Sequence, residues 1–164
     1  MKILYLFRHA KSSWDEPLLS DFDRPLSKRG QKTAPQMGKI MRQRKVSPDL
    51  VISSPARRTK ETAKLALEKA RIDADVVFTE AIYEASVRAL LSVLSKQDGG
   101  VGSILMIGHN PGMSDLIETL TGQVEEFPTA ALARLSLAIN HWREIEAGCG
   151  KLDWLVRPKD VLEN

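Results

Sequence analysis

Three short polar segments of the chain carry side chains that can attack or bind a phosphoryl group. In the first, Arg8-His9 places an imidazole beside a guanidinium. Segment 54–59 adds two arginines, and segment 108–112 adds His109. A neutral imidazole can attack phosphorus, while guanidinium groups and backbone N–H donors can hold the phosphoryl oxygens. Each segment alone is more often structural, but together they predict a phosphoryl-transfer site.

Each of these segments directly follows a short apolar run that is typical of a buried strand. Such runs occur at residues 3–7, 50–52, 76–78 and 104–107. Helical spacing of apolar residues is found at about 30–44, 56–71, 87–94 behind Ser86 as N-cap, and 113–120. Alternating strands and helices predict an α/β fold, a mostly parallel sheet with helices on both faces. In such folds reactive groups gather beyond the carboxyl ends of the strands, so the three segments should meet in one cleft.

The end of the sequence is expected to add two more strands, at about residues 133–139 and 151–156. Antiparallel pairing near the C-terminus is one arrangement open to them. The length of 164 residues and the lack of a linker or repeat predict a single domain, residues 1–164.

Composition and charge narrow the classes of partner. The 24 basic and 21 acidic residues nearly balance, and we interpret the locally basic stretch 39–45 as a solvated helix face. We therefore expect no nucleic-acid or membrane partner. No carboxylate cluster or His/Cys spacing suggests a metal, so we expect neither a metal nor another cofactor. A single cysteine, Cys149, and the absence of a signal peptide or membrane-spanning stretch favour a cytoplasmic location.

Four ordered motifs give the chain a family resemblance. The motifs are Arg8 to Asp15, Asp23 to Gly30, Ser54 to Thr62 and Gly108 to Gly112. Together they resemble the histidine phosphatase superfamily, which has the phosphoglycerate mutase-like fold, and within it the small SixA-type phosphohistidine phosphatases. Ala10 and Lys11 stand at two positions where many relatives have Gly followed by a different residue.

The resemblance implies roles for individual residues. His9 would be the nucleophile and form a transient phosphohistidine that water hydrolyses, while Arg8, Arg58 and His109 would bind the phosphoryl oxygens. The second arginine of the family stands four residues after the serine, which selects Arg58 over Arg57. Attack requires an unprotonated nitrogen on His9, and we expect its other ring nitrogen to donate to a backbone carbonyl. We expect His109 to donate to a phosphoryl oxygen.

The general acid is a separate question. Larger relatives carry a Glu or Asp after the third strand, where Glu84 is the first candidate here and Glu80 the second. The alternative is that Glu84 is simply a solvated residue before the Ser86 cap. An imidazole leaving group departs with little help, so the need for an acid depends on the substrate.

Some of the other motif residues are expected to stabilise the structure, and others could contact the substrate. Asp23, Arg24 and Gly30 are expected to close the loop after the first strand and to start the following helix. Lys11, Ser12 and Ser13 lie near enough in sequence to reach a phosphate, and both interpretations stay open for them.

The sequence thus predicts a metal-independent phosphatase acting on phosphohistidine in proteins or on other phosphomonoesters. A small-molecule phosphatase or a phosphoglycerate mutase-like enzyme is the alternative within the family, although long insertions that would roof a metabolite pocket are missing. A non-catalytic phospho-binding module is the alternative from another class, and the pair His9 and His109 argues against it. The sequence carries no signal for an oligomeric state.

Overall fold

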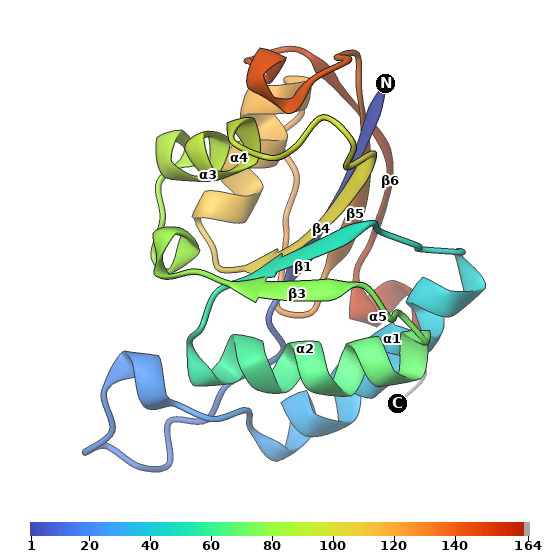
Figure 1. Ribbon diagram of the computed structural model, residues 1–164. Coiled ribbons are helices and arrows are strands. Elements are labelled where there is room, and N and C mark those ends of the chain that lie inside the picture. Colours follow the sequence, from blue (N-terminus) through green and yellow to red (C-terminus); the bar gives the residue numbers. More distant parts are fainter. Residues whose placement is uncertain (163–164) are drawn as a thin grey trace.

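A six-stranded sheet with the order β3-β2-β4-β1-β5-β6 forms the centre of the computed structural model, which describes residues 1–162 (Figure 1). The strands are β1 (Lys2–Arg8), β2 (Leu50–Ser53), β3 (Asp75–Phe78), β4 (Ser103–Gly108), β5 (Leu132–Leu137) and β6 (Gly150–Val156). The first four strands are mutually parallel, while β5 is antiparallel to both β1 and β6. The predicted fold class is confirmed, including the antiparallel strands near the C-terminus.

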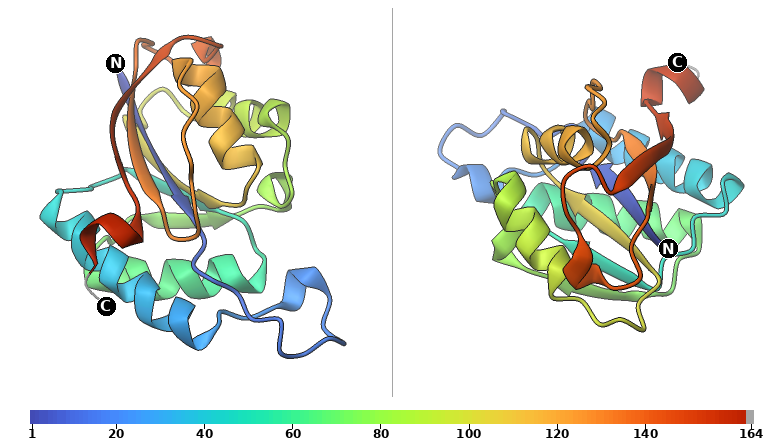
Figure 2. Two further views of the ribbon diagram at one scale, coloured as in Figure 1. Left: turned by 180° about the vertical axis from the view of Figure 1, so that it is seen from behind. Right: turned by 90° about the horizontal axis from the view of Figure 1, so that it is seen from above.

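Helices cover both faces of this sheet (Figures 1 and 2). Helices α1 (Lys28–Gln43) and α2 (Arg57–Ala70) lie on one face, and α3 (Val87–Ser95) and α4 (Gly112–Thr121) lie on the other. The short α5 (Pro158–Val161) follows β6. Three single turns of 3₁₀ helix complete the list: η1 (Asp21–Asp23), η2 (Glu80–Ile82) and η3 (Trp142–Glu144). No helix in this described part of the chain is both long and apolar enough to cross a membrane.

The continuous apolar run of β1 supplies two cores at once, because successive side chains of a strand point to opposite faces. Leu4 and Leu6 are fully buried in the core under α3 and α4. Phe7 is fully buried in the core under α1 and α2, where it meets the apolar stripe of α1 that includes Met37 and Met41. Burial on both faces is what makes the strand an unbroken apolar run in the sequence.

Serine side chains cap the start of two helices, as the sequence predicts for Ser86. The Ser27 hydroxyl accepts a hydrogen bond from the backbone N–H of Gly30, and Ser86 does the same for Ala89. Each hydroxyl thereby satisfies a backbone donor that the first turn of a helix leaves without a partner.

The pairing register brings three strand ends into one row. Arg8 at the end of β1 is opposite Gly108 of β4, and Ser53 at the end of β2 is opposite Ile107. The three polar segments that follow these strands therefore start side by side, although about 45 to 55 residues of sequence separate each from the next. Figure 1 shows the segment between β1 and α1 extending from this end of the sheet.

Candidate active site

His9 is held by its backbone on both sides and by one ring nitrogen. Its N–H donates to Gly108 O at 3.1 Å, and its carbonyl accepts from Ala130 N at 2.9 Å. The imidazole is buried, with Nδ1 2.7 Å from the carbonyl oxygen of Ala10. A carbonyl only accepts, so Nδ1 carries the proton and Nε2 keeps its lone pair. A backbone carbonyl is the partner predicted for this nitrogen from the sequence.

Ala10, whose carbonyl orients His9, is itself anchored to α2. The Ala10 N–H donates to Thr62 Oγ1 at 3.0 Å, and that hydroxyl donates to the carbonyl of Arg58 at 2.7 Å. Thr62 is fully buried, so the chain of hydrogen bonds is shielded from water. Thr62 thus helps to fix the position of the His9 ring through the backbone of Ala10.

Burial keeps His9 neutral. Desolvation is the largest effect, and together with His109, Arg58 and Arg8 it lowers the pKa of His9 to about 3, against the opposing hydrogen bond to Ala10. Water no longer stabilises the imidazolium, and the neighbouring cations repel it. An unprotonated nitrogen is therefore available at neutral pH.

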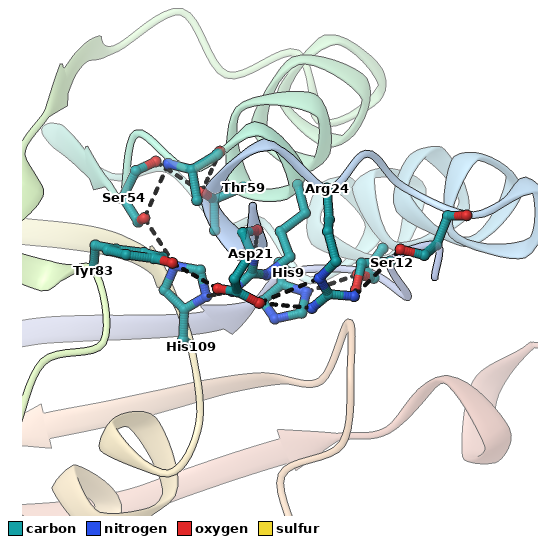
Figure 3. Close-up of polar contacts among 12 residues, drawn as sticks. His9, Ser12, Asp21, Arg24, Ser54, Thr59, Tyr83 and His109 are labelled. Atoms are coloured by element: carbon teal, nitrogen blue, oxygen red, sulfur yellow. Dashed lines mark hydrogen bonds and ion pairs between the residues drawn. The ribbon is translucent and has the colours of Figure 1, made fainter. Parts of the chain in front are cut away.

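His109 makes two hydrogen bonds that define its tautomer (Figure 3). Its Nδ1 lies 3.2 Å from Arg58 Nη2, and its Nε2 lies 2.8 Å from Ser54 Oγ. A guanidinium only donates, so Nδ1 accepts and Nε2 donates to the serine. Burial and then Arg58 lower the pKa of His109 to about 4. The ring lies beside His9, at a centroid distance of 5.1 Å, but both of its nitrogens are engaged within the protein.

Asp21 and Tyr83 belong to the same network, and sequence reasoning did not select either one. The carboxylate of Asp21 accepts from Arg58 Nη2 at 3.0 Å and from the Tyr83 hydroxyl at 2.6 Å, and its carbonyl accepts from Arg58 Nη1 at 2.7 Å. Burial alone would raise the pKa of Asp21, but the Tyr83 and Arg58 hydrogen bonds outweigh it and lower the pKa to about 2. Burial and then Asp21 raise the pKa of Tyr83 to about 12. Asp21 is therefore ionised and Tyr83 neutral at pH 7.

Arg8 has a different environment, because its contacts are to a carbonyl and not to a carboxylate. Arg8 Nη1 donates to Phe127 O at 3.2 Å, and the Asn110 amide donates to the same carbonyl at 2.8 Å. Arg8 Nε and Arg58 Nε are both buried without a hydrogen-bond partner. Burial and the charge of Arg58 lower the pKa of Arg8. Arg58 is buried and Arg8 partly buried, and two guanidinium groups that act on each other's charge favour an anion between them.

Arg24 closes the loop after β1, as expected, and also reaches the site. It donates to Ser12 Oγ at 2.7 Å and to Asp21 Oδ1 at 3.2 Å. Its guanidinium carbon lies 3.5 Å from the ring centroid of Trp14, whose own side chain is mostly exposed. The loop is tight at Gly30 as well, since a Cβ there would lie 2.2 Å from the carbonyl oxygen of Lys11. Arg24 and Gly30 therefore have the structural role that the sequence indicates, and Arg24 adds a charge to the site.

These side chains surround a central cavity of about 430 Å³. Its wall consists of Arg8, His9, Lys11, Ser12, Trp14, Asp21, Arg24, Arg58, Glu84, His109, Asn110 and Thr129. Four cations and two carboxylates thus face the cavity, which gives it an excess of positive charge that attracts phosphate.

Of the residues that the sequence left as alternatives, only some line the cavity. Arg58 is buried at its wall, whereas Arg57 is exposed and paired with Glu61 at 3.2 Å. Glu84 lines the cavity from an exposed rim position with a left-handed backbone, φ 51°, and Glu80 does not line it. Of the three loop residues that were left open, Lys11 and Ser12 line the cavity and Ser13 does not. Within residues 1–162, no three His, Cys, Asp or Glu side chains are grouped so that they could hold a metal ion.

Comparison with known proteins gives concordant matches. Residues 4–90 match the model of the histidine phosphatase superfamily, branch 1. An uncharacterized chloroplastic protein of Arabidopsis thaliana is 35% identical over 97% of this chain and 79% of its own length. An uncharacterized protein of Mycobacterium tuberculosis is 31% identical over 88% of this chain and 95% of its own length. The crystal structure of a protein assigned as the phosphohistidine phosphatase SixA of Agrobacterium tumefaciens superposes with a TM-score of 0.82 at 29% identity, covering 96% of this chain and 98% of the other.

Proposed function

The chain belongs to the histidine phosphatase superfamily, and from this premise we propose that it is a phosphatase that hydrolyses phosphohistidine in proteins through a covalent intermediate on His9. The observation that carries the proposal is the neutral imidazole of His9, with Nδ1 bound to Ala10 O, in a cavity with three guanidinium groups. A nucleophile and oxyanion ligands are the two requirements of metal-independent phosphoryl transfer.

In the first step the lone pair on His9 Nε2 attacks phosphorus while the bond to the leaving group breaks. The bonding pair departs with the leaving group, which takes up a proton from water or, for a poor leaving group, from Glu84. Arg8 and Arg58 hold the phosphoryl oxygens, whose charge matches the two guanidinium groups. Because Asp21 binds Arg58 through both its carboxylate and its carbonyl, the guanidinium is already oriented before the substrate arrives.

In the second step water attacks the phosphorus of phospho-His9. The P–N bond breaks, its electron pair returns to Nε2, and inorganic phosphate leaves with the oxygen of the water. Ala10 O accepts the Nδ1 proton of His9 and so stabilises the positive charge that this ring carries while Nε2 is phosphorylated.

Glu84 is the residue that we propose as proton donor for poor leaving groups. It lines the central cavity, and no ion pair joins it to another described residue. An ester needs a proton on its departing oxygen, whereas the imidazole of a phosphohistidine departs more readily. The role of Glu84 therefore depends on the substrate.

The decisive experiment measures turnover of a phosphohistidine peptide and of p-nitrophenyl phosphate, in the presence of a chelator. We expect hydrolysis of both, and a transient enzyme phosphorylation that is labile to acid and stable to alkali. His9→Ala should abolish turnover and labelling, while His141→Ala, which changes an exposed histidine outside the cavity, should retain both. Full activity of His9→Ala would overturn the mechanism. Binding of the phosphopeptide without any hydrolysis by the wild-type protein would indicate a binding module instead.

A further inference from the structure

Two grooves continue from the central cavity in different directions. The first, which we call the α1 groove, shares Lys11 and Thr129 with the cavity and runs between α1 and α5, with volumes of about 240 and 280 Å³ in its two parts. The second, which we call the α4 groove, shares Glu84, His109 and Asn110 with the cavity, reaches the start of α4 and has a volume of about 550 Å³. Helices α1 and α4 cover opposite faces of the sheet, so the grooves leave the cavity on opposite sides.

The α1 groove is cationic. Among residues 1–162, its charged lining residues are Lys11, Arg29, Lys32 and Lys159, and none of the carboxylates of that range belongs to its wall. None of these four cations has an ion pair with a described residue, and α1 itself contains no Asp or Glu. Like charges three residues apart on a helix, as at Arg29 and Lys32, repel each other. The wall therefore favours an anionic occupant.

The α4 groove has the opposite charge. In the part of the chain that the structure describes, its charged lining residues are Glu84 and Asp115, and no Lys or Arg belongs to its wall. Neither carboxylate has an ion pair with a residue among 1–162. A cationic occupant is therefore favoured on this side of the cavity.

We propose that the two grooves bind the polypeptide on either side of the phosphorylated residue. The inference rests on the proposed function and deepens it: the substrate segment has acidic residues on the side that lies in the α1 groove and basic residues on the side that lies in the α4 groove. The continuity of both grooves with the cavity supports a chain that passes through all three. A nucleic acid or an anionic membrane fits less well, because its negative charge would be repelled by Glu84 and Asp115.

The test uses peptides of equal length with one central histidine, phosphorylated chemically. One peptide has glutamates before the histidine and lysines after it, a second has the reverse order, and a third has uncharged flanks. We expect one of the two charged orders to have a kcat/KM about tenfold above that of the uncharged peptide, and the other order to show no gain. Equal kcat/KM for both orders would overturn the proposal.

Reversing the charge of residues in each groove tests whether the flanks of the peptide bind there. The double variant Lys32→Glu/Lys159→Glu should lower kcat/KM for the preferred peptide about tenfold, mainly by raising KM, and so should Asp115→Lys. Neither should change turnover of p-nitrophenyl phosphate by more than about twofold, because that substrate is small enough for the central cavity alone. The matched control is Lys39→Glu/Lys64→Glu, which makes the same change of net charge on exposed positions outside both grooves. An equal loss in this control would show an effect of net charge and contradict the groove.

A binding measurement separates failure of the grooves from failure of the proposed function. Fluorescence anisotropy of the same labelled peptides with the His9→Ala protein reports binding without turnover. If the wild-type protein turns over p-nitrophenyl phosphate but no phosphohistidine peptide, the proposed substrate is wrong. Adding Lys32→Glu/Lys159→Glu to the His9→Ala protein should weaken binding of whichever charged peptide binds more tightly; this loss would then still support the grooves, and unchanged binding would overturn them.

Discussion

Arg58 and His109 are hydrogen-bonded to each other, with Arg58 Nη2 3.2 Å from His109 Nδ1. The guanidinium can only donate, so the bond exists only while His109 is neutral and its Nδ1 unprotonated. A phosphoryl dianion would change both conditions. It offers Arg58 another acceptor, and it neutralises the charge that opposes protonation of His109. The donor role that the sequence suggests for His109 thus requires the substrate to displace the contact seen in the structure.

This relationship predicts that anion binding raises the pKa of His109. In the free protein burial and Arg58 lower that pKa to about 4. Saturation with inorganic phosphate should raise it by about one unit or more, because each unit corresponds to only about 1.4 kcal/mol of added attraction for the proton. Titration of the ring signals of His109 by NMR measures this shift, with chloride at equal ionic strength as the control. An unchanged pKa would mean that the Arg58 contact persists in the complex.

A second prediction concerns the other nitrogen of the same ring. Ser54→Ala removes the acceptor of the His109 Nε2 proton and leaves a buried donor without a partner. We expect the free energy of unfolding to fall by about 1–3 kcal/mol and kcat/KM to fall about tenfold. Ser53→Ala is the matched control, since that hydroxyl bonds to Ser54 O and does not touch His109. Urea unfolding and p-nitrophenyl phosphate turnover check the pair, and equal effects of both variants would contradict the role of Ser54.

Much of the fold and of the site can be predicted from the sequence, because it depends on residues that are neighbours in the chain. The apolar run of β1 predicts a strand that is buried on both faces, and the polar residues that follow the run must lie at the carboxyl end of that strand. Parallel pairing of β1, β4 and β2 then brings the segments that carry His9, His109 and Arg58 together without further information. The family spacing after Ser54 favours Arg58 over Arg57 as the second arginine, and the burial of Arg58 agrees with this prediction.

Asp21 and Tyr83 were not predicted to belong to the site, because their contact depends on how two irregular segments approach each other. Their hydrogen bond joins residues 62 positions apart, one in η1 and the other directly after η2. No periodic pattern specifies that distance. The available signal was chemical: a guanidinium buried at Arg58 needs a carboxylate nearby, and the loop after β1 contains several aspartates. The signal predicts that a partner exists without indicating which aspartate it is.

The two neighbouring arginines give a third prediction. Arg58→Ala should lower kcat/KM for p-nitrophenyl phosphate about 10²- to 10³-fold, because it removes a fixed ligand of the phosphoryl oxygens. Arg57→Ala should change it by less than about threefold, because an exposed ion pair such as that with Glu61 contributes little. Both variants need a circular dichroism spectrum to show that they are folded. A larger loss in Arg57→Ala would mean that the second arginine has been assigned to the wrong position.

The burial of His9 gives a fourth prediction, on stability in acid. The pKa of His9 falls from its ordinary value of 6.5 to about 3 in the folded protein. Between these values the unfolded chain binds more protons, so lowering the pH favours unfolding. Through His9 alone, the free energy of unfolding should fall by about 2 kcal/mol from pH 7.5 to pH 5. Urea unfolding at both pH values should show a correspondingly smaller fall for His9→Asn, and an identical fall would contradict the buried neutral imidazole.

The last prediction separates the two interpretations of Glu84. If its carboxyl protonates the leaving group, Glu84→Gln should lower kcat for a phosphate ester of a poor leaving group about 10²-fold and leave that for a phosphohistidine peptide within about twofold. Glu80→Gln is the matched control, because Glu80 is exposed and does not line the central cavity. A solvated Glu84 without a chemical role would behave like Glu80 on both substrates. Loss of activity on the phosphohistidine peptide as well would instead indicate that Glu84 acts in substrate binding, where the α4 groove meets the central cavity.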